Sequence, residues 1–428
     1  MLNVYKLDDL NQEKIKELCI RNADIDSNIR STVENIIEEV KQKGDSALRA
    51  FAREFDGVNL TQLYIGKEEI DSLSAQGGES EKEALRLAYN NIRKFHETQL
   101  IKENKVETTT GVVCWREARA IQKVGLYIPG GTAVLPSTFL MLGIPAMLVG
   151  CAEIVVCSPP QKNGRVNPYL AFCAKLLGIE RIYLVGGAQA VAAMAYGTES
   201  IPKVDKIFGP GNQYVTKAKT IIQSESQTAI DMPAGPSEVL VIADNSANPV
   251  FVAADLLAQA EHGTDSQAVL VSTSLDIIDQ TIAELEKQLL ALPRRDIAAK
   301  AIANSYAILA DDLPGAMRFS NEYAPEHLIL ATDQWEAMID KITNAGSVFL
   351  GHLTPESAGD YASGTNHTLP TSSYAKAYSG ASIDSFVKKI TFQHISKIGI
   401  ENLGPAVQVL ASLEGLDGHR NAITVRLK

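Results

Sequence analysis

The sequence lacks the short signatures by which several classes of protein are recognised. Its five cysteines are scattered and none forms a CxxC pair, which excludes a cysteine-rich zinc site and predicts reduced thiols in the cytoplasm. The HExxH motif is absent, and no basic block with interleaved aromatic residues is present. Because the net charge is −11, a general nucleic-acid binder is not expected.

Long uninterrupted apolar segments are also missing. The first residues are acidic and mixed in character, unlike a signal peptide. Only residues 137–157 resemble a membrane-spanning run, and it is interrupted by Gly143, Pro145, Gly150 and Glu153. We therefore predict a buried helix followed by a buried strand in this stretch, and no association with a membrane.

The sequence does contain the alternation typical of an α/β protein. Its 428 residues are long enough for two or three domains. Charged amphipathic stretches at 12–54 and 68–104 predict helices. Helical patterns separate most of seven short apolar runs of strand length, which lie at 124–128, 153–157, 181–185, 237–243, 268–272, 327–331 and 347–350. Such alternation predicts parallel sheets with helices on both faces.

Three glycine-rich turns follow strand-like segments, at 125–131, 185–190 and 208–212. Glycine at the carboxyl end of a parallel strand lets a ligand approach the backbone. None of the turns completes the GxGxxG motif, so they indicate a dinucleotide site only weakly, and a structural role is the alternative. If a nucleotide binds, the polar side chains best placed by these turns are Tyr127, Gln189 and Asn212.

A glutamine and a histidine close one predicted helix. Gln259 and His262 are three residues apart, so they share one face of the helix, and Gly263 is a usual helix stop. The two side chains therefore point to one place at the helix end. The alternative is a simple C-cap, with the histidine near the negative end of the helix dipole.

A second pair, Glu326 and His327, lies where a loop enters a predicted buried strand. A neighbouring carboxylate and imidazole suit proton transfer, because both can titrate near neutrality. The alternative is a histidine bonded to a backbone carbonyl beside a solvated glutamate. His96, in a charged helical stretch, is expected to be a solvated surface residue.

Two further acid–histidine pairs lie toward the end of the chain. Asp360 and His367 belong to a polar stretch, 355–383, that predicts a long loop, and such loops are usually either functional or disordered. Glu414 and His419 belong to a final segment that is too short to hold its own core. Two nitrogen and two oxygen ligands suit zinc or a similar divalent ion, and they are supplied by Gln259, His262, Asp360 and His419.

Eight motifs, in order along the chain, resemble those of the histidinol dehydrogenase family. They cover most of the chain beyond residue 120, whereas the first 100 residues match only in general character. The motifs are GLYIPGGTAVLPST, VGGAQAVAAMAYGT, KIFGPGNQYVTKAK, DMPAGPSEVLVIAD, LLAQAEHG, YAPEHL, ESAGDYASGTNHTLPT and EGLDGHRNAI.

The resemblance implies an NAD-linked, four-electron oxidation of L-histidinol to L-histidine through L-histidinaldehyde, with one zinc ion per subunit. It implies zinc ligands at Gln259, His262, Asp360 and His419, and general bases at Glu326 and His327. Substrate contacts are implied at Ser237, Gln259, His262, His327, Asp360, Glu414 and His419. NAD contacts are implied at Tyr127, Gln189 and Asn212. His367 is expected near the site, without an assigned role.

The resemblance also implies an organisation into two incomplete Rossmann-like units. We expect an N-terminal helical arm at 1–25, a first α/β domain formed by 26–125 and 238–380, and a second at 126–237. The remaining segment, 381–428, would be a small tail domain that crosses to a second subunit. A homodimer would then bring Glu414 and His419 of one chain to the site of the other.

Two other functions compete with this one. A zinc hydrolase could use Glu326 to activate water, and it would need no nucleotide. A two-lobed protein that binds a small cationic metabolite would suit the acidic charge. However, it would give no reason for the Glu326–His327 pair or for a set of metal ligands.

Overall fold

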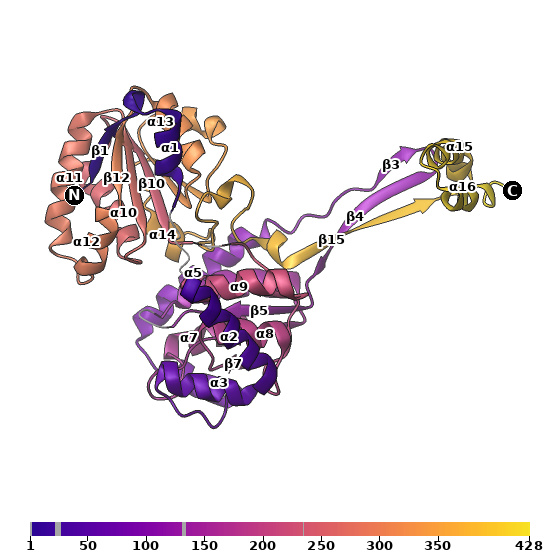
Figure 1. The fold of residues 1–428 in the computed structure, drawn as a ribbon, viewed down its shortest axis with the longest axis horizontal. Helices are drawn as coiled ribbons and strands as arrows, with labels where there is room; N and C mark the ends of the chain where they lie inside the picture. The colour runs from indigo at the N-terminus through magenta and orange to yellow at the C-terminus, as the bar shows by residue number, and fades with distance from the viewer. Residues whose placement is uncertain (1, 22–26, 131–133, 234) are drawn as a thin grey trace.

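The computed structural model describes residues 2–21, 27–130, 134–233 and 235–428. Within them the chain forms two six-stranded sheets, each covered by helices, and a three-stranded sheet that extends away from the body as an arm (Figure 1). The predicted α/β class is confirmed. Gly131 of the first glycine-rich turn and the end of the predicted N-terminal arm, 22–25, lie outside the described residues.

Sheet A is parallel throughout and is built mainly from the C-terminal half of the chain. Its central strand β10 is buried at every position, as expected where helices cover both faces. In spatial order the strands are β1 (Asn3–Lys6), β12 (Tyr306–Leu309), β11 (Gln267–Ser272), β10 (Glu238–Ala243), β13 (His327–Ala331) and β14 (Ser347–Leu350).

Two apolar cores hold the helices against sheet A. One face carries α10 (Pro249–Ala260), α11 (Leu275–Leu289) and α12 (Arg295–Ala303). The other carries α1 (Gln12–Cys19), α13 (Leu313–Tyr323) and the 3-10 helix η3 (Trp335–Lys341). A short 3-10 helix, η1 (Leu7–Asp9), links β1 to α1, so the predicted helical arm begins with a strand.

Sheet B is parallel apart from one antiparallel edge strand, β2. In spatial order its strands are β2 (Tyr64–Gly66), β7 (Arg181–Tyr183), β6 (Glu153–Cys157), β5 (Lys123–Tyr127), β8 (Lys206–Phe208) and β9 (Ala229–Ile230). The run at 137–157 is a buried helix followed by a strand, as predicted. Among the described residues, the structure contains no helix long and apolar enough to cross a bilayer.

Helices again cover both faces of sheet B. One face carries α2 (Ser27–Lys43), α3 (Asp45–Phe51), α8 (Gly187–Tyr196) and α9 (Gln213–Glu225), and the π-helix η2 (Ala52–Asp56) continues directly from α3. The other carries α4 (Lys67–Ser74), α5 (Glu79–Glu97), α6 (Pro136–Val149) and α7 (Pro168–Leu177).

The packing of α2 to α5 differs from the predicted grouping, which placed residues 26–125 with 238–380. Ile29 and Leu48 share a core with Val191 of α8, which covers sheet B, and Ile92 packs with Leu140 of α6. Tertiary burial decides the partner of an amphipathic helix, and the sequence of such a helix does not name that partner. Sheet A therefore takes its edge strand from β1, and η1 and α1 pack beside it.

The two sheets have the same strand order. In each, the chain moves outward from a central strand in one direction and then returns to its other side, so the order reverses between β10 and β13 and between β5 and β8. Ligands of open α/β sheets bind at the carboxyl ends of strands beside such a reversal. In sheet A this position is next to Asp244, which follows β10. The Asp244 carboxylate already accepts hydrogen bonds from the hydroxyls of Ser246 and Thr332.

The arm joins two segments that are far apart in the sequence. Strand β4 (Val112–Ala120) pairs along its whole length with β15 (Val387–Ile395), and β3 (Val106–Thr109) lies at the edge of β4. The helices α15 (Lys397–Leu413) and α16 (Asp417–Thr424) lie at the far end of the arm, away from both large sheets (Figure 1). The remaining short helices are α14 (Glu356–Tyr361), η4 (Tyr374–Lys376) and η5 (Ile383–Phe386).

Candidate active site

The predicted catalytic pair lies at the amino edge of sheet A. His327 is the first residue of β13 and pairs in register with Val239 of β10, so Glu326 and Glu238 lie at the entrance of neighbouring strands. Ser237, half-buried, directly precedes Glu238. The site is therefore at the opposite edge from the one where parallel sheets usually bind ligands.

The Glu326 carboxylate and the His327 ring are both held by the backbone of one residue. The N–H of Glu238 donates to Glu326 Oε2 (2.8 Å), and the carbonyl of Glu238 accepts from His327 Nδ1 (3.0 Å). A carbonyl can only accept, so Nδ1 carries a proton and Nε2 faces the site. Both side chains are buried, that of Glu326 being 8% exposed and that of His327 4% exposed.

Buried carboxylates surround this histidine. His327 Nδ1 lies 3.6 Å from Glu326 and 3.9 Å from Glu356, and its Nε2 lies 3.4 Å from Asp360 Oδ1. Burial lowers the pKa of His327, but the negative charges of Glu356, Glu326 and Asp360 outweigh it and raise the pKa well above its usual value. Burial raises the pKa of Glu326 to about 8, against the attraction of His327. A carboxylate with a raised pKa is a stronger base.

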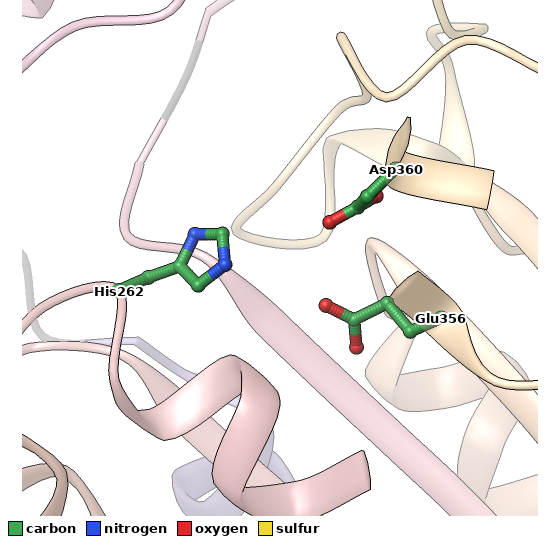
Figure 2. Close-up of side chains that lie close together, drawn as sticks. All are labelled: His262, Glu356 and Asp360. Atoms are coloured by element: carbon green, nitrogen blue, oxygen red, sulfur yellow. The ribbon is translucent and has the colours of Figure 1, made fainter. Parts of the chain in front are cut away.

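A second group of donors lies beside the pair. Figure 2 shows the ring of His262 turned toward the carboxylates of Glu356 and Asp360, and one ligand atom of each lies within 4.8 Å of the others. His262 follows α10 and remains exposed, whereas both acids lie on α14 and are buried. Although part of His262 is open to solvent, the protein atoms around it exclude enough water to lower its pKa. The negative charge of Asp360 acts in the opposite direction and has the smaller effect. A neutral ring is the form that binds metal.

Gln259, buried in the last turn of α10, faces the same place. With its nitrogen toward Glu356, the amide donates to that carboxylate and accepts from the N–H of Glu238 at 2.9 Å. Turned the other way, it would set its oxygen against the Glu356 carboxylate, which requires a cation or a proton between the two oxygens. The helix end thus brings both Gln259 and His262 to one point, as predicted.

The charge balance of this group fits a bound cation. Glu326, Glu356 and Asp360 are buried carboxylates close together, and buried charges need partners. Within the described residues, Asp360 Oδ1 and His327 Nε2 are buried without a hydrogen-bond partner. Two carboxylates, an imidazole and an amide are also donors that suit zinc. The residues present therefore fit a divalent metal ion.

The sequence interpretation missed Glu356. It also placed Asp360 in a long loop, whereas Asp360 lies on the six-residue helix α14. The four-residue spacing of Glu356 and Asp360 puts both on one helix face, and this signal could have revealed Glu356. His367 is close by, because its Nδ1 lies 2.8 Å from the Asp360 carbonyl and its Nε2 lies 2.9 Å from Thr138 Oγ1 of α6.

The predicted nucleotide-binding residues gather at the carboxyl edge of sheet B. The N–H of Gly187, the first residue of α8, donates to Tyr127 Oη (3.2 Å), and the Gln189 side chain lies over Gly187. Asn212 is the N-cap of α9. Two helices therefore begin beside the strand-order reversal of this sheet, an arrangement that binds phosphate groups in other α/β proteins.

Gly209 brings the backbones of β5 and β8 together at this reversal. Its φ of +128° is unfavourable for other residues, and a Cβ there would lie 2.1 Å from the Tyr127 carbonyl oxygen. Lys219 supports the same turn by donating a hydrogen bond to the Gly209 carbonyl (3.0 Å). The N–H of Gly209 in turn donates to the Asp231 carboxylate (2.9 Å). Two hydrogen bonds therefore hold this turn, although its GxGxxG motif is incomplete.

Glu414 and His419 are not brought to the site in this chain. Glu414 is the C-cap of α15 and His419 lies on α16, both at the far end of the arm (Figure 1). Their predicted roles need a second chain.

The expectation for His96 was wrong. Its side chain is fully buried, and its Nδ1 lies 2.8 Å from the Ile92 carbonyl oxygen. Ala88, Ile92 and His96 form a stripe on α5 that packs toward α6, and burial lowers the pKa of the ring. The charged neighbours of His96 lie on the other faces of the helix.

Comparisons with known proteins identify similar chains. The profile of the histidinol dehydrogenase family matches residues 20–427. A histidinol dehydrogenase of Bacteroides thetaiotaomicron is 55% identical over 416 residues, covering 97% of both chains. A chloroplastic histidinol dehydrogenase of Arabidopsis thaliana is 51% identical, covering 99% of this chain and 91% of that protein. A crystal structure of histidinol dehydrogenase from Elizabethkingia anophelis has a TM-score of 0.96 at 51% identity, covering 100% of this chain and 98% of that one.

Proposed function

Because the chain belongs to the histidinol dehydrogenase family of oxidoreductases, we propose that it oxidises L-histidinol to L-histidine through L-histidinaldehyde, the last two steps of histidine biosynthesis, using zinc and NAD. The observation that carries the proposal is the buried Glu326–His327 pair beside the donor group of His262 and Asp360. The five free thiols accord with a reducing, cytoplasmic location.

Gln259, His262 and Asp360 would hold the metal from this chain, and His419 would complete the set from a partner. Zinc would serve mainly as a template that binds the imidazole and amine of histidinol. Tyr127, Gln189 and Asn212 would contact NAD, which accepts one hydride in each oxidation. Ser237, Glu414 and His327 would contact the substrate alongside the metal ligands.

His327 would act in the first oxidation. A divalent ion held at Asp360 would offset the negative charge that raises the pKa of His327, so that the ring is neutral. Its Nε2, which faces the site and has no hydrogen-bond partner among the described residues, would then take the hydroxyl proton as the carbon loses hydride. The product is the aldehyde. Asp360, 3.4 Å from Nε2, stabilises the charge that the ring gains.

Glu326 would act in the second oxidation. Its carboxylate takes a proton from water, and the resulting hydroxide adds to the aldehyde to give the anion of the hydrate. This anion would lose hydride to a second NAD and become the carboxylic acid, which releases a proton to give the carboxylate of histidine. The hydrogen bond from the Glu238 N–H to Oε2 leaves Oε1 of Glu326 for this proton transfer. One site for both steps keeps the reactive aldehyde bound.

The first test is the stoichiometry of the reaction. Purified, zinc-loaded protein with excess NAD is expected to form two NADH per histidinol consumed, with histidine as the product. Absorbance of NADH and chromatography of histidine measure both quantities. One NADH per histidinol would place the second oxidation elsewhere. No NADH, with zinc still bound, would overturn the proposal in favour of hydrolysis.

The tail would complete the site of a partner in a homodimer. Its helices expose apolar side chains, among them Val409 (60%), Leu410 (58%) and Leu413 (78%). Apolar surface this exposed at the end of an extended arm favours contact with another chain. His419 and Glu414 lie within the same pair of helices.

Mixed dimers test this arrangement. His262→Ala and His419→Ala chains should each be inactive alone, because each lacks one ligand at every site. After dissociation and random reassociation of equal amounts, about a quarter of the wild-type activity should return, since half of the dimers are mixed and each has one intact site. A site formed within one chain would recover nothing, and that result would contradict the crossing tail.

A further inference from the structure

Arg21 lies behind the catalytic pair and has no place in the proposed chemistry. It is the last described residue before the chain leaves sheet A for α2. Its guanidinium forms a buried ion pair with Glu238, with Nη2 2.7 Å from Oε2, and their side chains are 4% and 0% exposed. Its Cζ also lies 3.5 Å from the centre of the Tyr323 ring.

The guanidinium joins three segments that lead into the site. One is the start of β10, through the Glu238 carboxylate. The second is the turn from α13 to β13, because both Nη atoms donate to the Tyr323 carbonyl, at 3.0 and 3.1 Å. The third is the loop at Ser373, whose hydroxyl accepts from Nη1 at 2.9 Å. Only the planar fork of an arginine can serve these acceptors together.

Glu238 transmits this arrangement to the catalytic pair. Its side chain is fixed by Arg21 and by the N–H of Ser372 (2.6 Å), while its backbone holds Glu326 and His327. A small rotation of Glu238 would therefore move both catalytic side chains together. Replacing Arg21 would therefore affect catalysis even if neither substrate nor NAD contacts this residue.

We propose that Arg21 is a positioning residue, which acts through Glu238 and the Tyr323 carbonyl to hold Glu326 and His327 in their working orientation. Its effect on histidinol oxidation rests on the proposed function. Its effect on the geometry of the His327 ring does not.

The kinetic test uses Arg21→Lys, which keeps the charge and loses the fork. We expect kcat to fall about ten-fold, with KM for histidinol and NAD nearly unchanged, because displaced catalytic groups slow the chemical steps. Glu238→Gln should have a similar effect, and the double variant should lose no more than the worse single variant. Multiplied losses would show that Arg21 does not act through Glu238.

Arg30→Lys is the matched control, since Arg30 pairs with Glu34 on the exposed surface of α2. If the loss of kcat in the Arg21→Lys protein equals the fraction of that protein that is unfolded, the folded molecules are fully active. That result would show a purely structural role for Arg21 and overturn the proposal. Nuclear magnetic resonance of ¹⁵N-labelled histidine gives an independent readout. The proton on His327 Nδ1 should shift in Arg21→Lys and not in Arg30→Lys.

An unmoved resonance would overturn the positioning role whatever the substrate is. A shifted resonance in a protein that does not oxidise histidinol would support the positioning role and overturn the proposed function alone.

Discussion

Glu326→Gln is expected to stop the reaction after the first oxidation, so that NADH formed per histidinol falls from two to one. The glutamine keeps an oxygen to accept the Glu238 N–H, and the local structure should survive. An amide cannot take the proton of water, so oxidation of the aldehyde should slow by about 10²–10⁴-fold. A trapping amine and chromatography would measure the released aldehyde.

Glu68→Gln provides the matched control, because Glu68 is exposed on α4. It should leave the stoichiometry at two. If Glu326→Gln still formed two NADH at the wild-type rate, another group would have to activate the water, and the assignment of Glu326 would fail.

His262→Ala is expected to remove the metal while leaving the fold intact. The ring is exposed in the site and, among the described residues, it packs in none of the apolar cores. The free energy of unfolding in a chelator should therefore stay within about 1 kcal/mol of wild type. Loss of a donor should weaken zinc binding by more than about 100-fold, with activity falling in step. Atomic emission measures zinc per chain without reference to activity.

His352→Ala is the comparison variant, since His352 bonds to Asp333 at the other edge of sheet A. It should bind zinc normally. A His262→Ala chain that unfolds even relative to metal-free wild type would mean that this residue supports the fold and is not a ligand.

Local signals predicted the strands and much of the site. The apolar runs at 153–157, 327–331 and 347–350 match β6, β13 and β14 residue for residue. They succeed because a buried parallel strand must be apolar throughout and its ends are marked by turns. The spacing of Gln259 and His262 succeeded similarly, since a helix end fixes the direction of two side chains.

Long-range packing set the limit of these predictions. Glu356 was missed because the short helix α14 was interpreted as part of a loop, and the four-residue spacing of Glu356 and Asp360 has meaning only on a helix. His96 is a polar residue at a buried position of α5. Its charged neighbours in the sequence suggested that it faces solvent, whereas its side chain faces the core. Nothing in the sequences of β4 and β15 states that they pair, because that depends on where the chain returns after both large sheets have formed.

The pairing of β4 with β15 also orders the events of folding. It closes a loop in which Ser396 Oγ meets the Gly111 carbonyl 285 residues away. Contacts of such sequence separation form late, since the intervening chain must first become compact. We therefore expect the tail helices to be presented after both lobes have become compact. With the tail crossing to a partner as proposed, recovery of activity from denaturant is expected to end in an encounter between two chains, so its final phase should quicken as protein concentration rises.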